Sequence, residues 1–239
     1  MIYRSNLLLP VDLQPGFGAT TICGTMGHSY GHDIICDKDY ERNCGFITHD
    51  EAAILYHIAK RTPGKWIDIG SRFGWSSAHI ALSGSTVFAV DQDYKVPHLL
   101  ERARANLRGH IETCLRIVPV AKTSNEYFED LMDTEYFDGV MVDGNHDHPC
   151  PTEDASNAMD VITGKGVIVF HDFWGRPVQD AVNYLINEGM KCRVYNTPNG
   201  MAVCGDFPLE QFPDHVPDPT IDWNMLRKRC VGFNFERTV

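Results

Sequence analysis

The chain has 239 residues, of which 43% are hydrophobic, and this is enough for one well-filled domain but short for two. Its formal net charge of −11 argues against nucleic acid as the main partner, because a phosphate backbone is bound by clustered Lys and Arg side chains. No stretch approaches the roughly 20 apolar residues that cross a bilayer, and the 8 cysteines form no CxxC pair, so we expect a reduced, cytoplasmic protein that binds no membrane.

Residues 1–46 show no sustained hydrophobic period, and we interpret them as an irregular N-terminal extension that serves as a lid or substrate loop. Regular structure begins at Thr48, which has capping-box spacing to Glu51. The apolar residues that follow recur at helical spacing: Ala52, Leu55, Tyr56 and Ala59. A helix is therefore expected to start after Thr48 and to stop at Pro63-Gly64.

From residue 65 onward, short apolar runs typical of buried strands alternate with helical stripes. The runs predict strands at 65–69, 86–91, 111–118, 137–143 and 166–170. The stripes predict helices at 75–82, 96–107 and 124–132, one capped by Thr152 with Ala155, Ala158, Met159 and Ile162 inside, and one with Val178 to Ile186 inside. The segments 191–195 and 201–205, joined by Pro198-Asn199-Gly200, predict a closing hairpin.

Strand-then-helix units followed by a hairpin predict an α/β fold with a doubly wound, mainly parallel, seven-stranded sheet. We place this Rossmann-like domain at residues 47–206. Residues 207–239 are expected to form a C-terminal tail, because prolines recur through them (Pro208, Pro213, Pro217 and Pro219). A short helix is expected in this tail at 223–229.

Polar residues collect at the predicted carboxyl ends of the parallel strands, which is where ligands bind in such sheets. They stand in four groups: Asp68-Ile69-Gly70-Ser71-Arg72-Phe73-Gly74, then Asp91, then Asp143-Gly144-Asn145-His146, and then His171-Asp172. Repeated carboxylates at one edge of a buried sheet indicate a site for hydroxyl groups, for cations or for both.

The first group has two glycines, Gly70 and Gly74, between a strand and a helix, where they let the backbone turn tightly and approach a ligand. Asp91 follows about 20 residues later, where an acidic residue accepts hydrogen bonds from the ribose hydroxyls of an adenosine. Together they predict an adenosine-containing cofactor. The alternative for Asp91 is a helix-capping role in its loop.

Asp143 and Asp172 end two strands that should be neighbours in the sheet. Two carboxylates held this close repel each other unless a cation lies between them. Oxygen ligands suit Mg²⁺, and a nearby imidazole would also admit Mn²⁺, Fe²⁺ or Zn²⁺. His146, three residues after Asp143, titrates near neutrality and suits the role of a general base that removes the proton of a bound hydroxyl.

Together these residues resemble the class I S-adenosylmethionine-dependent methyltransferases. They are most similar to the metal-dependent sugar O-methyltransferases related to macrocin and mycinamicin O-methyltransferases and to the cephalosporin hydroxylase-like proteins. The resemblance covers residues 48–205 and rests on these blocks: 68–74 with Ser76, 90–91, 137–146, Asp154, and 164–172. It implies methyl transfer from S-adenosylmethionine to a hydroxyl of a small molecule, a sugar or polyol.

The resemblance also implies roles for individual residues. The implied cofactor contacts are Asp68, Gly70, Ser71, Arg72, Phe73, Gly74, Ser76, Asp91, Gln92, Ala121 and Asp143. The implied ligands of a divalent metal, which we expect to be Mg²⁺, are Asp143, His171 and Asp172, with His146 as the general base. His171 stands where relatives often carry an acidic residue, and Ala121-Lys122-Thr123 stands where many carry an acidic residue near the adenine.

Three other functions compete with methyl transfer. An NAD-dependent oxidoreductase would carry G-x-G-x-x-G at the first turn, and this chain has G-x-x-x-G there. A metal-dependent oxygenase or hydrolase would use Asp143, His146, His171 and Asp172, since two His and a carboxylate favour Fe²⁺. A binding module would keep the fold without turnover. A homo-oligomer is compatible with all of these.

Overall fold

Seven strands form a single sheet in the order β3-β2-β1-β4-β5-β7-β6. In the computed structural model, the described residues are 6–9, 47–97, 100–101, 115–131, 135–206, 208 and 211–238. The strands are β1 (Lys65–Ile69), β2 (Thr86–Val90), β3 (Ile117–Val120), β4 (Phe137–Val142), β5 (Ile162–Phe170), β6 (Lys191–Tyr195) and β7 (Met201–Gly205). All neighbours from β3 to β5 pair in parallel, and β7 pairs antiparallel with both β5 and β6. The predicted doubly wound, mainly parallel sheet is confirmed.

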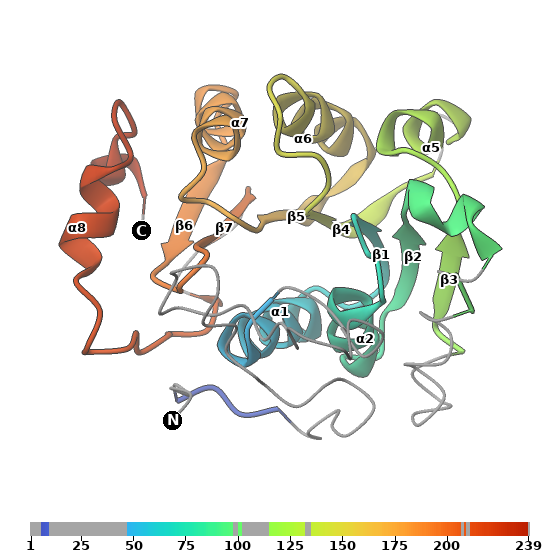
Figure 1. Ribbon diagram of the computed structural model, residues 1–239, viewed down its shortest axis with the longest axis horizontal. Helices are drawn as coiled ribbons and strands as arrows, with labels where there is room; N and C mark the ends of the chain where they lie inside the picture. The colour runs from blue at the N-terminus through green and yellow to red at the C-terminus, as the bar shows by residue number, and fades with distance from the viewer. Residues whose placement is uncertain are drawn as a thin grey trace.

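Helices cover the sheet on both sides (Figure 1). On one side lie α1 (His49–Arg61) and α2 (Trp75–Leu82), and on the other lie α5 (Ser124–Asp130), α6 (Cys150–Val161) and α7 (Arg176–Asn187). Short helices complete the described part of the chain: η3 (Gln92–Lys95), α8 (Trp223–Lys228) and η5 (Phe235–Arg237). No helix among the described residues is both long enough and apolar enough to cross a membrane.

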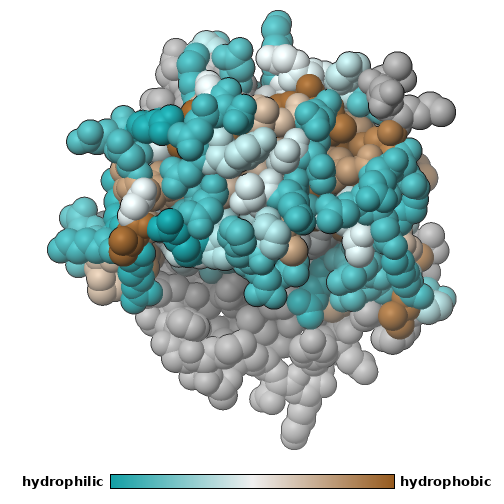
Figure 2. All heavy atoms as spheres, turned by 90° about the horizontal axis from the view of Figure 1, so that it is seen from above, coloured by the Kyte–Doolittle hydropathy of each residue, from teal (hydrophilic) through white to brown (hydrophobic). Residues whose placement is uncertain are grey.

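The core has two halves because strand side chains alternate between the faces of the sheet. Val167 and Val169 of β5 pack on the side of α1 and α2, whereas Ile168 and Phe170 pack on the side of α6 and α7. A strand buried on both faces has no polar face, which explains the continuous apolar runs in the sequence. The outer surface of the α5–α7 layer, by contrast, is mainly hydrophilic, with scattered apolar side chains (Figure 2).

Local sequence signals explain most element boundaries. Thr48 caps α1 through the predicted capping box, since its hydroxyl accepts from the amide of Glu51 at 3.2 Å and the Glu51 carboxylate accepts from the amide of Thr48 at 2.8 Å. Strands β1, β6 and β7 and helix α2 have the predicted bounds. Thr123, which the sequence prediction did not use as a cap, starts α5 with a second capping box to Glu126.

The predicted boundaries that are most clearly wrong are those of α6, β5 and β3. Helix α6 is capped at Pro149 rather than Thr152, because Pro151 is tolerated in the first turn and the helix can start earlier. Ile162, predicted on the inner face of that helix, begins β5, where it pairs with Phe137. Strand β3 lies at 117–120 rather than 111–118. It is an edge strand of the sheet, a position in which Pro119 is tolerated. Most of the predicted 96–107 helix lies outside the described residues.

The C-terminal tail packs back onto the domain. Phe233 lies edge-on to Phe173 with ring centroids 4.9 Å apart, and His215 forms a buried ion pair with Asp50 of α1. Asn6 also contacts this tail, and its side-chain amide donates a hydrogen bond to the backbone carbonyl of Asp214 at 2.8 Å. Of the predicted N-terminal extension, only residues 6–9 are described, so its proposed lid role lies outside the described structure.

Candidate active site

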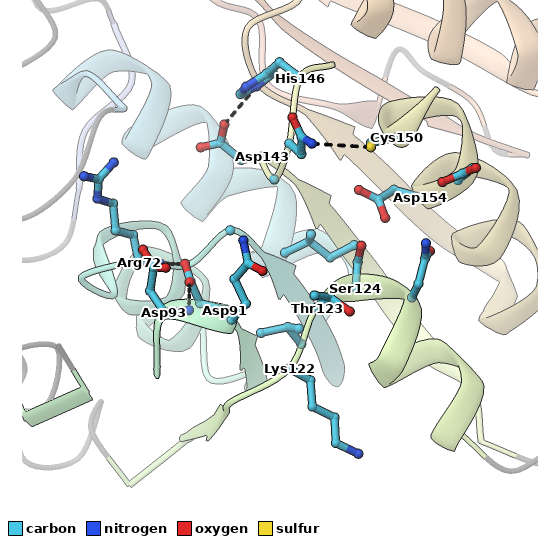
Figure 3. A pocket seen from close by; sticks show the side chains of 18 of the residues that line it. Arg72, Asp91, Asp93, Lys122, Thr123, Ser124, Asp143, His146, Cys150 and Asp154 are labelled. Atoms are coloured by element: carbon cyan, nitrogen blue, oxygen red, sulfur yellow. Dashed lines mark hydrogen bonds and ion pairs between the residues drawn. The ribbon is translucent and has the colours of Figure 1, made fainter. Parts of the chain in front are cut away.

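A cavity of about 630 Å³ opens at the carboxyl ends of the parallel strands (Figure 3). This volume falls within the range of small-molecule and cofactor sites. Its wall combines the ends of β1, β2, β4 and β5 with the first residues of α5 and α6. The cavity therefore lies at the location that the sequence predicted for the site, the carboxyl edge of the sheet.

The turn after β1 depends on three residues with positive φ. Gly70 has φ 79°, Arg72 has φ 43° and Gly74 has φ 83°. Space as well as φ requires glycine at position 70, because a Cβ there would lie 2.0 Å from the carbonyl oxygen of Asp143. The turn thus brings the end of β1 against the end of β4 and leaves Gly70 and Arg72 on the cavity wall.

Asp91 lies at the end of β2 on the same wall. One of its carboxylate oxygens accepts from the amide of Arg72 at 2.7 Å, and the other accepts from the amide of Asp93 at 2.8 Å. Burial raises the pKa of Asp91, and these amide hydrogen bonds counteract that rise. A carboxylate offers about four acceptor positions, so each oxygen of Asp91 can still accept from a hydroxyl of a ligand in the cavity.

Asp143, His146 and Asp172 form a cluster at one end of the cavity. One potential ligand atom from each of the three lies within 4.8 Å of the others. His146 Nε2 lies 3.6 Å from Asp143 Oδ1 and 3.3 Å from Asp172 Oδ2. Asp172 reaches this position from a backbone with φ 53°, a left-handed conformation that Asp tolerates better than most residues. The predicted juxtaposition of the two strand-end carboxylates is present.

Charge compensation dominates the pKa values in this cluster. Burial would raise the pKa of Asp143, but the charge of His171 and the hydrogen bond from His146 outweigh it and hold that pKa at about 2. The hydrogen bond to Asp143 in turn raises the pKa of His146. Asp143 is therefore ionised at neutral pH, as a cation ligand must be.

His171 lies behind the cluster instead of in the cavity. Its side chain is fully buried, since strand alternation directs it to the face of Val167 and Val169, beneath α1. Its Nδ1 lies 3.3 Å from both Asp143 Oδ1 and Asp172 Oδ2, and its Nε2 lies 3.1 Å from Glu51 Oε2. Burial lowers the pKa of His171, but the charges of Asp143 and Glu51 prevail and raise it well above its usual range.

Residues 67–173 match the family model described as a methyltransferase domain. The match spans less than half of the chain. The strand order and the cavity at the strand ends agree with a methyltransferase domain in this part of it. The match does not support the dinucleotide oxidoreductase and the metal-dependent oxygenase or hydrolase as alternatives. No curated protein matches the chain in sequence.

Solved structures of methyltransferases share the fold at low sequence identity. An O-methyltransferase from Bacillus cereus in complex with SAH is 13% identical with a TM-score of 0.58, over 76% of this chain and 97% of that one. The O-methyltransferase TomG from Streptomyces achromogenes in complex with SAM is 15% identical with a TM-score of 0.56, over 66% and 80%. The SAH-bound Podospora anserina methyltransferase PaMTH1 is 12% identical with a TM-score of 0.54, over 66% and 79%.

The predicted cofactor contacts fall into two sets, those that line the cavity and those that do not. Those on the cavity wall are Gly70, Arg72, Asp91, Gln92 and Asp143. Those that do not line the cavity are Asp68, Ser71, Phe73, Gly74, Ser76 and Ala121. The second set mainly builds the turn: the Asp68 carboxylate accepts from the hydroxyl of Ser76 at 2.7 Å, and the Ser71 hydroxyl bonds to that of Tyr94 at 2.9 Å.

One wall of the cavity consists of residues to which the sequence prediction assigned no site role. It is formed where α5 and α6 begin, by these residues: Thr123, Ser124, Asn125, Cys150, Glu153 and Asp154. The capping box of Thr123 and Glu126 was a usable signal, because it fixes where α5 starts beyond the end of β3. Within this wall, burial raises the pKa of Asp154 to about 6, against a hydrogen bond with Ser124.

Proposed function

We propose that the chain transfers the methyl group of S-adenosylmethionine to a hydroxyl oxygen of a small molecule, with a divalent cation at Asp143 and Asp172 and His146 as the base. The observation that carries this proposal is the cluster of Asp143, His146 and Asp172 beside the cavity that Asp91 lines. The names of the similar O-methyltransferase structures agree with oxygen as the acceptor. Our proposed acceptor class is a sugar or polyol.

The residues present fit an adenosine cofactor. Asp91 keeps acceptor capacity on both carboxylate oxygens and lies beside Gln92 and the Gly70 turn, so ribose hydroxyls have acceptors on this wall. The recessed wall of α5 and α6 leaves room beyond the ribose for a base. The cluster of Asp143, His146 and Asp172 at one end of the same cavity would then lie towards the methyl group.

The residues present also fit a divalent cation. The carboxylates of Asp143 and Asp172 offer oxygen donors, which suit Mg²⁺ or Mn²⁺, and the imidazole of His146 beside them is left to accept a proton. His171 is less suited to ligation than predicted, because both of its ring nitrogens already face carboxylate oxygens. When bound, the cation would lower the pKa of the acceptor hydroxyl and orient it.

His146 would complete the reaction as the proton acceptor. The hydroxyl oxygen attacks the methyl carbon in line with the carbon–sulfur bond, and the bonding electron pair leaves with sulfur as the neutral thioether. The hydroxyl proton passes to His146 Nε2, whose side chain is 43% exposed and therefore accessible to an acceptor. Asp143 and Asp172 stabilise the imidazolium that results, since both lie within 3.6 Å of this nitrogen.

The test is a coupled assay for S-adenosylhomocysteine with S-adenosylmethionine and a panel of sugars, polyols and catechols. We expect product only with a hydroxyl acceptor, loss of activity in EDTA, and recovery with Mg²⁺ or Mn²⁺. Full activity in EDTA would exclude the cation, and methylation of amines or thiols alone would exclude the oxygen acceptor. A cytoplasmic location stays a prediction from the cysteine pattern, and a small-molecule partner stays a prediction from the family resemblance.

A further inference from the structure

Glu51 is a fully buried residue that does not line the cavity. It belongs to the first turn of α1, and its Oε2 accepts from the amide of Thr48 at 2.8 Å and from the side-chain amide of Asn199 at 3.1 Å. Its Oε1 accepts from the backbone amide of Asn199 at 3.1 Å. The carboxylate is therefore fixed from two directions, by α1 and by the turn between β6 and β7.

Glu51 also contacts His171, which lies beside the carboxylates of the active site. His171 Nε2 lies 3.1 Å from Glu51 Oε2, and the opposite ring nitrogen lies 3.3 Å from both Asp143 Oδ1 and Asp172 Oδ2. Each ring nitrogen of His171 thus faces at least one carboxylate oxygen. Glu51 fixes the ring on one side, and the ring fixes the two carboxylates on the other.

Burying these polar side chains costs free energy. Taking a carboxylate and an imidazole out of water carries a desolvation penalty that their attraction does not reliably exceed. The capping box alone does not need the charge of Glu51, because Gln serves equally at that position. The amides of Thr48 and Asn199 are neutral donors, whereas His171 connects the charge of Glu51 to Asp143 and Asp172.

We propose that Glu51 is a positioning residue for the active site, which sets the places of Asp143 and Asp172 through His171. The inference rests on the proposed function of that cluster. It assigns the predicted metal ligand His171 to a supporting place behind the carboxylates. It also links the active site to α1 and to the turn at Asn199, both outside the cavity wall.

Asp50 supplies a matched control. It precedes Glu51 in the same helical turn, is 7% exposed, and also pairs with a histidine, but that histidine is His215 of the tail. Asp50→Asn therefore removes the charge of a buried carboxylate that faces an imidazole, in the same helical turn, without touching the cavity. A merely structural role for Glu51 predicts that Asp50→Asn and Glu51→Gln behave alike.

The experiment compares wild type, Glu51→Gln and Asp50→Asn in three measurements: Mn²⁺ affinity by electron paramagnetic resonance, S-adenosylmethionine affinity by calorimetry, and kcat and KM. We expect Glu51→Gln to weaken Mn²⁺ binding and lower kcat by about 10- to 100-fold, as loss of partners behind metal ligands typically does. Its S-adenosylmethionine affinity should stay within about 2-fold, because Asp91 and the Gly70 turn are untouched. Asp50→Asn should match wild type in all three.

Two outcomes would overturn the inference alone: wild-type Mn²⁺ affinity and kcat in Glu51→Gln, or equal losses in both variants. A wild type that neither binds Mn²⁺ nor methylates any hydroxyl would instead overturn the proposed function, and the positioning role with it. If Glu51→Gln does not fold, Glu51→Asp carries the test, because it keeps the charge and withdraws it from His171. Weaker Mn²⁺ binding in that variant supports the inference, and unchanged binding refutes it.

Discussion

Gly70 and Asp143 lie so close that a Cβ on Gly70 would come within 2.0 Å of the carbonyl oxygen of Asp143. Gly70→Ala should therefore either unfold the first turn or displace Asp143, since a backbone carbonyl cannot move aside alone. Gly84→Ala is the control, because Gly84 also has positive φ but has no atom within 4 Å of its Cβ position. Chemical denaturation should show a loss of about 1–2 kcal/mol for Gly84→Ala and a clearly larger loss for Gly70→Ala. Equal losses would mean that φ, and not the contact, requires glycine.

Asp91→Ala should weaken S-adenosylmethionine binding by about 10- to 100-fold, because hydrogen bonds to a charged acceptor contribute about 1.5–3 kcal/mol each. Isothermal titration calorimetry measures this directly. Asp138→Ala provides the control at the opposite end of the sheet, where its carboxylate accepts from the amide of Lys65. An unchanged affinity in Asp91→Ala would refute the ribose assignment.

Asp172→Asn should raise the concentration of Mg²⁺ needed for half-maximal activity by at least about 10-fold. Asn tolerates the left-handed backbone at φ 53° as well as Asp does, so the substitution tests charge without backbone strain. Asp147→Asn, at an exposed position of the neighbouring loop, should leave the Mg²⁺ requirement unchanged. The cation assignment fails if both variants respond to Mg²⁺ as the wild type does.

His146→Gln should lower kcat by about 10²- to 10⁴-fold, the usual contribution of a general base. S-adenosylmethionine affinity should change little, because His146 contacts the carboxylates and not the Gly70 turn. His148→Gln, two residues on and exposed, should retain wild-type turnover. Steady-state kinetics with separate cofactor titration distinguishes these outcomes, and a near-wild-type kcat in His146→Gln would exclude it as the base.

Asp68→Asn should change the pH dependence of stability. Burial raises the pKa of Asp68 to about 7, against hydrogen bonds from Ser77 and Ser76. The folded protein thus holds this proton more tightly than the unfolded chain, so the wild type loses stability as pH rises from about 4 to 7. Asn has no proton to lose. Thermal unfolding should therefore show the melting temperature of Asp68→Asn improving relative to wild type between pH 5 and pH 8, and a constant difference would contradict the raised pKa.

The candidate residues whose position at the cavity followed from the sequence are those at strand ends. Asp91 and Asp143 directly follow apolar runs, and the carboxyl ends of parallel strands meet at one edge of the sheet. Their convergence on one cavity needed no knowledge of helix packing. The same logic placed Asp172 beside Asp143, because β4 and β5 are neighbours.

His171 shows where strand position was not sufficient. The family resemblance implied that His171 is a metal ligand, but period-two alternation continues past the end of β5 and directs its side chain to the face of Val167 and Val169. Asp172, the next residue, lines the cavity from a left-handed backbone conformation with φ 53°. The sequence pattern gives no signal for such a turn at a residue other than glycine.

The sequence by itself determined the succession of strands and helices, the mainly parallel sheet, the capping box of α1 and the strand-end carboxylates, because each depends on local periodicity and on the connection rules of parallel sheets. Only the tertiary structure decided that Glu51 meets His171 across 120 positions of the chain, and that the starts of α5 and α6 close the cavity. Those contacts depend on how helices pack across the sheet. Packing distance and side-chain direction follow from the three-dimensional fit of whole elements, which no local pattern encodes.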